Sequence, residues 1–131
     1  MTMTKSAAVQ RPRVAFKRFT YSDLVGIEAA AQDLFDVPIG AIVTGGEIVI
    51  VTPFGSSRTF DIGDATDPNR YTASAVDGNT EARTALTLTG YKHTATETVK
   101  LTLAAGSEPS AGEGWVRLEY IVEDAMDSVQ G

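Results

Sequence analysis

The sequence of 131 residues has no cysteine, only one histidine and no long uninterrupted apolar run. Without cysteine there are no disulfides, no thiol nucleophile and no zinc site built on sulfur. With a single imidazole, His93, histidine-dependent nucleophilic catalysis has one possible base, and neither a GxSxG elbow nor a Walker A sequence accompanies it. No apolar run approaches the roughly 18 residues of a membrane helix, and the first residues lack the apolar core of a secretory signal. We therefore expect a non-enzymatic protein without a cofactor and outside the membrane.

Charge is unevenly distributed along the chain. Five of the eleven basic residues lie in residues 1–18, where there is no acidic residue, whereas the remainder carries six positive and seventeen negative charges. A basic leader on an acidic body is typical either of an arm that meets an acidic surface or of a solvated tail. The acidic body would repel phosphates, so we expect no nucleic-acid partner. The candidate partner-binding residues of the leader are Lys5, Arg11 and Arg13.

Composition and patterning predict one domain with short tails. The length leaves room for a single hydrophobic core, and a hydrophobic content of 43% is typical of globular proteins. The first residues have few apolar side chains and no strand alternation, which favours a flexible arm. We expect the arm to span residues 1–13, a β-sandwich domain residues 14–124 and a tail residues 125–131.

The last third of the chain shows the period of two that is typical of strands. In residues 115–122 the apolar side chains of Val116, Leu118, Tyr120 and Val122 share one face. Residues 98–103 and 86–89 alternate in the same way, with threonine on the outward face, and turn-rich segments separate the three runs. This pattern predicts a three-strand antiparallel meander.

The middle of the chain is also predicted to be β, with two open questions. Gly45-Gly46 separates residues 41–44 from 47–52 and suits either a bulge in one long strand or a tight hairpin. Residues 48–51 are apolar on both faces, so something must cover the second face: either a loop over a central strand or another subunit. Val49 and Val51 are the candidate interface residues.

Other elements are less strongly marked. Residues 59–63 read as a strand, and Tyr71–Ala75 as one more short strand. Residues 23–34 suit either a helix capped by Ser22 or Asp23 or a loop that leads into a strand at Leu34, because Gly26 weakens the helix. Seven or eight short strands in this length predict an all-β fold, a β-sandwich or jelly roll.

Two segments invite a chemical interpretation. His93 lies in a turn region without an adjacent carboxylate or serine, and we interpret it as a surface polar residue without a catalytic role. Asp64, Asp67 and Asn69 offer the oxygen ligands that calcium prefers, but their spacing misses the EF-hand pattern and no bidentate glutamate follows. We interpret this stretch as a turn whose side chains cap their own backbone. The seventeen acidic residues could form many carboxylate pairs for acid–base catalysis, but no sequence pattern marks one pair as a candidate.

The stretch 32–50, with its Pro38-Ile39-Gly40 turn and Val43-Thr44-Gly45-Gly46 segment, resembles small virion proteins of tailed phages. The Phe60-Asp61-Ile62-Gly63-Asp64 segment, the following Arg70-Tyr71 and the strands 86–91 and 116–122 resemble the same layout. The resemblance covers about residues 32–123 and is one of pattern, without catalytic residues.

The resemblance implies a capsid decoration, or cement, protein on the capsid surface of a virion made in the host cytoplasm. It implies a jelly-roll-like sandwich, a dimer or trimer, that binds the major capsid protein. The alternative is a phage tail or fibre module that recognises a glycan or receptor, which should present an aromatic platform.

Overall fold

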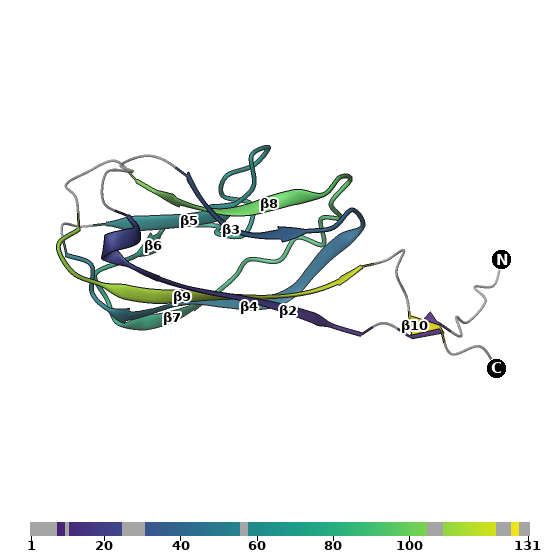
Figure 1. Ribbon diagram of the computed structural model, residues 1–131, viewed down its shortest axis with the longest axis horizontal. Helices are drawn as coiled ribbons and strands as arrows, with labels where there is room; N and C mark the ends of the chain where they lie inside the picture. Colours follow the sequence, from purple (N-terminus) through teal and green to yellow (C-terminus); the bar gives the residue numbers. More distant parts are fainter. Residues whose placement is uncertain are drawn as a thin grey trace.

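The computed structural model describes residues 8–9, 11–24, 31–55, 58–104, 109–122 and 127–128. It shows an all-β sandwich of two four-stranded antiparallel sheets, one above the other in Figure 1. The predicted fold class is therefore confirmed. Apart from one 3-10 turn at Tyr21–Asp23, the regular elements of the described residues are strands. No helix among them is long and apolar enough to cross a membrane.

One sheet has the strand order β2-β9-β4-β7 and the other the order β3-β8-β5-β6. The first contains β2 (Arg13–Thr20), β9 (Glu113–Val122), β4 (Ala41–Thr52) and β7 (Ala82–Ala85). The second contains β3 (Ala31–Val37), β8 (Glu97–Leu103), β5 (Thr59–Gly63) and β6 (Val76–Asp77). We call them the β2-β9-β4-β7 sheet and the β3-β8-β5-β6 sheet.

The strand pairs are nested. β2 pairs with β9, β3 with β8, β4 with β7 and β5 with β6, as in one long hairpin whose tip lies between β5 and β6. Rolling this hairpin adds the β4–β9 and β5–β8 pairs and closes the two sheets. This order is that of a jelly roll.

The meander prediction is wrong, although the faces of β8 and β9 were predicted correctly. Residues 86–89 form no strand, and Leu88 is 46% exposed. β8 lies in a different sheet from β7 and β9, and Leu86 lies after the end of β7. Alternation indicates which side chains face the core, but it does not indicate which other strand will pair with the alternating one. The connections across residues 86–96 and 104–112 are long enough to lead from one sheet to the other.

The core lies between the sheets and contains the apolar side chains that alternation predicted. Val99, Leu101 and Leu103 of β8 and Val116 and Leu118 of β9 are buried. At one end of the core the rings of Phe19, Phe54 and Phe60 pack against one another, with centroids 5.1–5.7 Å apart.

Gly45-Gly46 forms a bulge in one long strand, which resolves the first open question. The register between β4 and β9 shifts between Val43 and Gly45. Gly46 has a φ of 140°, and a Cβ there would lie 2.3 Å from the carbonyl oxygen of Arg117. A side chain at position 46 is therefore excluded, and the bulge requires glycine.

Two weaker predictions need correction. Ala31 to Leu34 belongs to β3, so the helix does not extend over these residues, and residues 25–30 lie outside the described part of the chain. Tyr71–Ala75 forms turns and bends, and the strand follows at Val76. Tyr71 instead turns its side chain into the core, where it is 1% exposed.

The predicted arm contains a short strand. β1 (Ala8–Val9) pairs antiparallel with β10 (Asp127–Ser128), a two-stranded ribbon to the right of the sandwich in Figure 1. This differs from the expectation of no strand before residue 14, as does β2, which already begins at Arg13. Residues 1–7 and 10, with Lys5, lie outside the described residues.

Candidate functional site

The outer faces of the two sheets differ in chemistry. Strand register places a set of large apolar side chains on the outer face of the β2-β9-β4-β7 sheet: Val14, Phe16, Ile42, Val49, Trp115 and Ile121, to which the exposed Val51 of β4 is added. The same face also carries the charged side chains Arg18, Glu47, Arg83, Glu113, Arg117 and Glu119. The outer face of the β3-β8-β5-β6 sheet carries threonines and charged side chains: Asp33, Asp36, Thr59, Asp61, Asp77, Thr98, Lys100 and Thr102. We call the outer face of the β2-β9-β4-β7 sheet the apolar outer face and that of the β3-β8-β5-β6 sheet the polar outer face.

An aromatic pair lies toward the β2 edge of the apolar outer face. Phe16 of β2 and Trp115 of β9 pack with ring centroids 5.4 Å apart, and Phe16 remains 54% exposed. Val14, two residues along the same strand, is 60% exposed. Scattered exposed apolar residues are ordinary, but Val14, Phe16 and Trp115 are neighbours on one sheet face and make a candidate interaction surface.

An ion-pair network lies beside the aromatic pair. The Glu47 carboxylate accepts hydrogen bonds from Arg117 Nε, at 2.6 Å, and from Arg83 Nε, at 3.1 Å. The hydrogen bond from Arg117, which outweighs the effect of burial, lowers the pKa of Glu47 below its ordinary value. The two arginines cover this carboxylate, which is only 7% exposed on an outward position. The sequence analysis did not predict this network, although a single charged residue, Glu47, next to the apolar run 48–51 is a signal for it.

The sequence-predicted partner residues are not brought together into one cluster. Val49 is half-buried opposite Trp115 and Val51 is 39% exposed, so both belong to the apolar outer face. Arg13 pairs with Tyr120, farther along β9, and both Arg11 and Arg13 are exposed. β4 lies between β9 and β7, which pair with its two edges but leave its outer face uncovered; a covering subunit stays a prediction.

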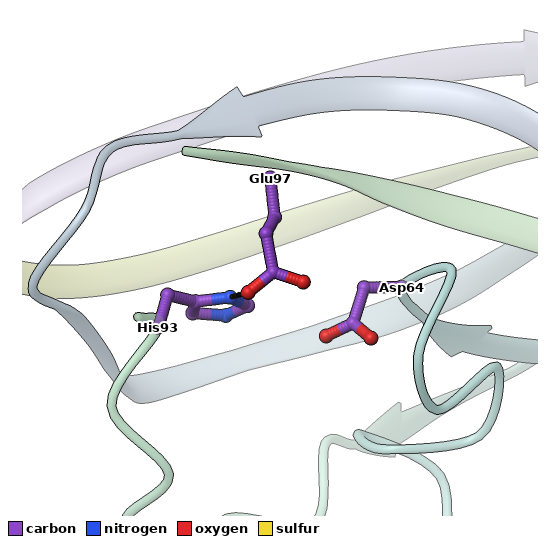
Figure 2. Close-up of side chains that lie close together, drawn as sticks. All are labelled: Asp64, His93 and Glu97. Atoms are coloured by element: carbon purple, nitrogen blue, oxygen red, sulfur yellow. Dashed lines mark hydrogen bonds and ion pairs between the residues drawn. The ribbon is translucent and has the colours of Figure 1, made fainter. Parts of the chain in front are cut away.

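A second cluster lies inside the sandwich, where three loops and one strand meet. His93 Nε2 lies 2.6 Å from the Tyr71 hydroxyl, and His93 Nδ1 lies 2.8 Å from Glu97 Oε1 (Figure 2). A carboxylate only accepts, so with a neutral imidazole Nδ1–H donates to Glu97 and Nε2 accepts from Tyr71. Burial raises the pKa of the Tyr71 phenol, which keeps the donating proton in place.

The interpretation of His93 as a surface residue is wrong. The side chain is 0% exposed, and the carboxylate that seemed missing is Glu97, four residues later. The backbone on both sides is tied to the start of β4, because His93 N donates to Ala41 O and His93 O accepts from Gly40 N. No residue pattern around position 93 distinguishes this buried arrangement from a solvated turn.

The predicted capping of the loop by its own side chains is found for Asp64. Asp64 Oδ1 accepts from the backbone N–H of Thr66 and of Asp67, at 3.0 and 2.9 Å, which caps the turn. The loop also needs Gly63, where a Cβ would lie 2.2 Å from the carbonyl oxygen of Asp67. The side chain of Arg70 then returns over Asp64, with Nε 2.7 Å from Oδ2.

This loop stabilises the ionised form of the Asp64 side chain. Burial acts to raise its pKa, but the hydrogen bonds from Arg70 and from the backbone of Asp67 outweigh it, and the pKa lies below its ordinary value. The guanidinium of Arg70 also lies 3.5 Å from the ring centroid of Tyr91. Tyr91 in turn packs edge-on against His93, so the Asp64 loop and the histidine cluster form one unit.

The cluster has the composition and the spacing of a metal site, but its ligand atoms already have hydrogen-bond partners. Ligand atoms of Asp64, His93 and Glu97 lie within 4.8 Å of one another (Figure 2). Both oxygens of Asp64 already accept from Arg70, whose positive charge would repel a cation, and both nitrogens of His93 have partners. The arrangement therefore fits a satisfied hydrogen-bond network that joins loops, and its burial gives a substrate no access to His93.

The fold is similar to those of solved structures that include three chains of phage capsids. The first comes from the cyanophage Pam1 capsid asymmetric unit, with a TM-score of 0.67 and 22% sequence identity over 93% of this chain and 92% of that chain. The second comes from the acid-stable capsid of Helicobacter pylori bacteriophage KHP30, with a TM-score of 0.67 and 15% identity over 96% of this chain and 97% of that chain. The third comes from the capsid of Ralstonia phage GP4, with a TM-score of 0.60 and 19% identity over 93% of this chain and 90% of that chain. Scans of the sequence against protein-family models and against curated proteins give no match. The likeness shows a shared fold.

Proposed function

We propose that this protein is a structural component of a phage virion that binds the outside of the assembled capsid as a decoration protein. The observation that carries the proposal is the likeness to chains of three capsid structures over nearly the full length of both partners. Because each match covers at least nine-tenths of both chains, those capsid chains are small sandwiches of about this size. The pattern resemblance to tailed-phage virion proteins points in the same direction.

The two outer faces favour attachment on one side. A subunit that sits on a shell needs one adhesive face and one that tolerates solvent. The apolar outer face, with Phe16 and Trp115, has the composition of the first. The polar outer face, which has Asp33, Asp36, Asp61 and Asp77 against the single positive charge of Lys100, has the composition of the second. The polar outer face would therefore point away from the capsid.

The experiment compares one substitution on each face. Phe16→Gln removes an exposed ring from the apolar outer face, and Thr102→Gln is the matched control on the polar outer face. Both positions retain contact with solvent, so neither change should disturb folding. We expect Phe16→Gln to weaken co-sedimentation with shells of the cognate major capsid protein at least tenfold and Thr102→Gln to leave it unchanged. Equal binding by both variants would contradict attachment through the apolar outer face.

The basic leader is proposed as a second contact with the shell. Lys5, Arg11 and Arg13 would add salt-sensitive attraction to an acidic surface. Because β2 begins at Arg13, the deletion that tests this ends at Pro12. The truncated protein should melt within a few degrees of the full chain, bind shells more weakly and depend less on salt. Unchanged decoration would make the leader an inert tail.

A homo-oligomer, dimer or trimer, is part of the proposal. Val51 is exposed and Val49 half-buried on the part of the apolar outer face over β4, and a second subunit would cover this part while the β2 edge with Phe16 contacts the shell. Val51→Asp should dissociate the oligomer at a concentration where the wild type stays associated, as measured by light scattering. A wild type that is monomeric at micromolar concentration would remove the interface, although not attachment to the shell.

The second candidate function is a tail or fibre module that binds a glycan. The exposed Phe16–Trp115 pair favours it, because sugars stack on such aromatic platforms. Electron microscopy of the virion distinguishes the two, since a decoration protein covers the head and a fibre module lies on the tail. A glycan ligand whose binding is lost in Phe16→Gln would support the module.

A further inference from the structure

Strand β2 lies at the edge of the β2-β9-β4-β7 sheet and has one free side. Its eight residues, Arg13–Thr20, pair with β9, and no other strand among the described residues pairs with β2. Every second residue of such an edge strand directs its backbone N–H and C=O away from the sheet, where they can pair with another extended chain. The free side of β2 is therefore long enough to accept a further strand.

A cavity of about 160 Å³ lies between β2 and β3, the edge strands of the two sheets. Four of its lining side chains are apolar: Phe19, Leu24, Leu34 and Leu101. Lys17 of β2 also lines the cavity and is exposed. A cavity of about 150 Å³ can hold a benzene ring, so this one suits a single large apolar side chain.

The cavity lies where an added strand would direct its side chains. Val14 and Phe16 point to the apolar outer face, whereas Lys17 and Phe19 point into the sandwich. A strand that pairs with β2 has the same alternation, so every second side chain of it would point inward on the side where the cavity lies. When a strand is added to a sheet edge, main-chain hydrogen bonds provide affinity and pockets for alternate side chains provide specificity.

The charge of β2 favours an acidic partner. The strand has no acidic residue and three basic ones: Arg13, Lys17 and Arg18. Arg18 Nη1 already lies 3.3 Å from Glu113 Oε2 of β9. Arg13 and Lys17 are exposed. A second copy of β2 would bring like charges together, whereas an acidic strand would face these side chains with opposite charge.

The carboxylates that line the cavity have partners within the chain. Asp33 Oδ1 accepts a hydrogen bond from Lys100 Nζ at 2.6 Å. Asp23 Oδ2 accepts one from the backbone N–H of Thr20 at 2.8 Å. Lys17 is therefore the charged side chain of the cavity with which an incoming segment can pair.

We propose that the free side of β2 accepts an extended, acidic segment of the major capsid protein as a fifth strand of the sheet, with one large apolar side chain of that segment in the cavity. The inference rests on the proposed attachment to the shell and deepens it, because it names the kind of segment that is bound. Phe16 lies on the same strand, so the ring and the added strand would belong to one contact with the shell.

The first test fills the cavity from within. Leu34→Trp places a larger side chain at a half-buried position that lines the cavity, and Ile39→Trp is the matched control at an exposed apolar residue between β3 and β4. Leu34→Trp should melt within a few degrees of the wild type but bind shells of the cognate major capsid protein about tenfold more weakly in co-sedimentation. Ile39→Trp should bind like the wild type.

The second test changes the charge without entering the core, and it serves if Leu34→Trp does not fold. Lys17 is exposed, so Lys17→Glu should leave the melting temperature nearly unchanged. It should weaken shell binding by about tenfold and make the remaining binding less dependent on salt. Lys17→Arg, which keeps the charge, should bind like the wild type.

Hydrogen exchange measures the main-chain pairing directly. Shells should slow exchange of the amides on the free side of β2 by about tenfold or more and leave those of β7, the opposite edge of the same sheet, unchanged. If shells bind the wild type and Leu34→Trp equally and leave β2 exchange unchanged, the added strand is refuted while attachment through Phe16 stands. Protection of β2 that rises with protein concentration without shells would assign the edge to a second copy of this chain and overturn the proposal. A wild type that does not bind shells would overturn the proposed function and this inference together.

Discussion

Removing the Asp64 carboxylate should destabilise the protein strongly. Four hydrogen bonds converge on this side chain, two from backbone N–H groups and two from Arg70. Asp64 is 1% exposed, and the side chain of Arg70 only 11%. Asp64→Ala would thus leave a largely buried guanidinium without its partner.

The magnitude follows from these contacts. Breaking a buried ion pair from one side costs about 3–5 kcal/mol, and the nearly complete burial of both partners places Asp64→Ala in that range. Asp64→Asn keeps an oxygen for the two backbone donors, each worth about 0.5–1.5 kcal/mol. We therefore expect the asparagine variant to lose about 1–3 kcal/mol less than the alanine variant.

Urea unfolding of the two variants and the wild type measures both differences. The slopes should agree among the three proteins, so that the midpoints report stability alone. Equal losses for alanine and asparagine would mean that the backbone caps contribute nothing. A loss below about 1 kcal/mol for Asp64→Ala would refute the view that the carboxylate holds Arg70.

Three further predictions follow from burial and charge. Leu118→Ala should cost about 2–5 kcal/mol in the same titration, against about 0.5 kcal/mol or less for Thr102→Ala on the polar outer face; equal losses would mean that the strand faces are misassigned. His93→Ala should lower the melting temperature by several degrees, because the Tyr71 and Glu97 side chains lose a buried partner; a neutral result would return His93 to the surface. The lowered pKa values of Asp64 and Glu47 mean that their stabilisation is complete above the unfolded-state values of about 3.9 and 4.3 and is lost as the pH falls through the folded-state values. As the pH is lowered, the free energy of unfolding should therefore fall less steeply for Asp64→Asn than for the wild type.

The sequence predicted which side chains face the core, because the period of two follows directly from strand geometry. Val99, Leu101 and Leu118 are buried as expected. The same period contains no information on partners: β8 alternates identically whether it pairs with β7 or, as it does, with β3 and β5. Sheet assignment depends on contacts between segments far apart in the chain.

The candidate sites show the same division. The turn at Asp64 was predictable, because its hydrogen bonds reach only two and three residues along the chain. The partners of His93 were not, since Tyr71 is brought to it from 22 residues away by the roll of the sheets. The apolar outer face likewise became visible only when the register placed Phe16 of β2 beside Trp115 of β9.

The nested pairing determines how the molecule would respond to a pulling force. β2 and β9 run antiparallel as neighbours, with Arg13 opposite Tyr120 near the ends that continue to β1 and β10. Tension applied through these two ends would open β1–β10 and then peel β2 from β9 one hydrogen bond at a time. Such unzipping needs far less force than sliding two strands past each other. In the role proposed above, load would therefore have to pass across a sheet face and not through the strand ends that continue to β1 and β10.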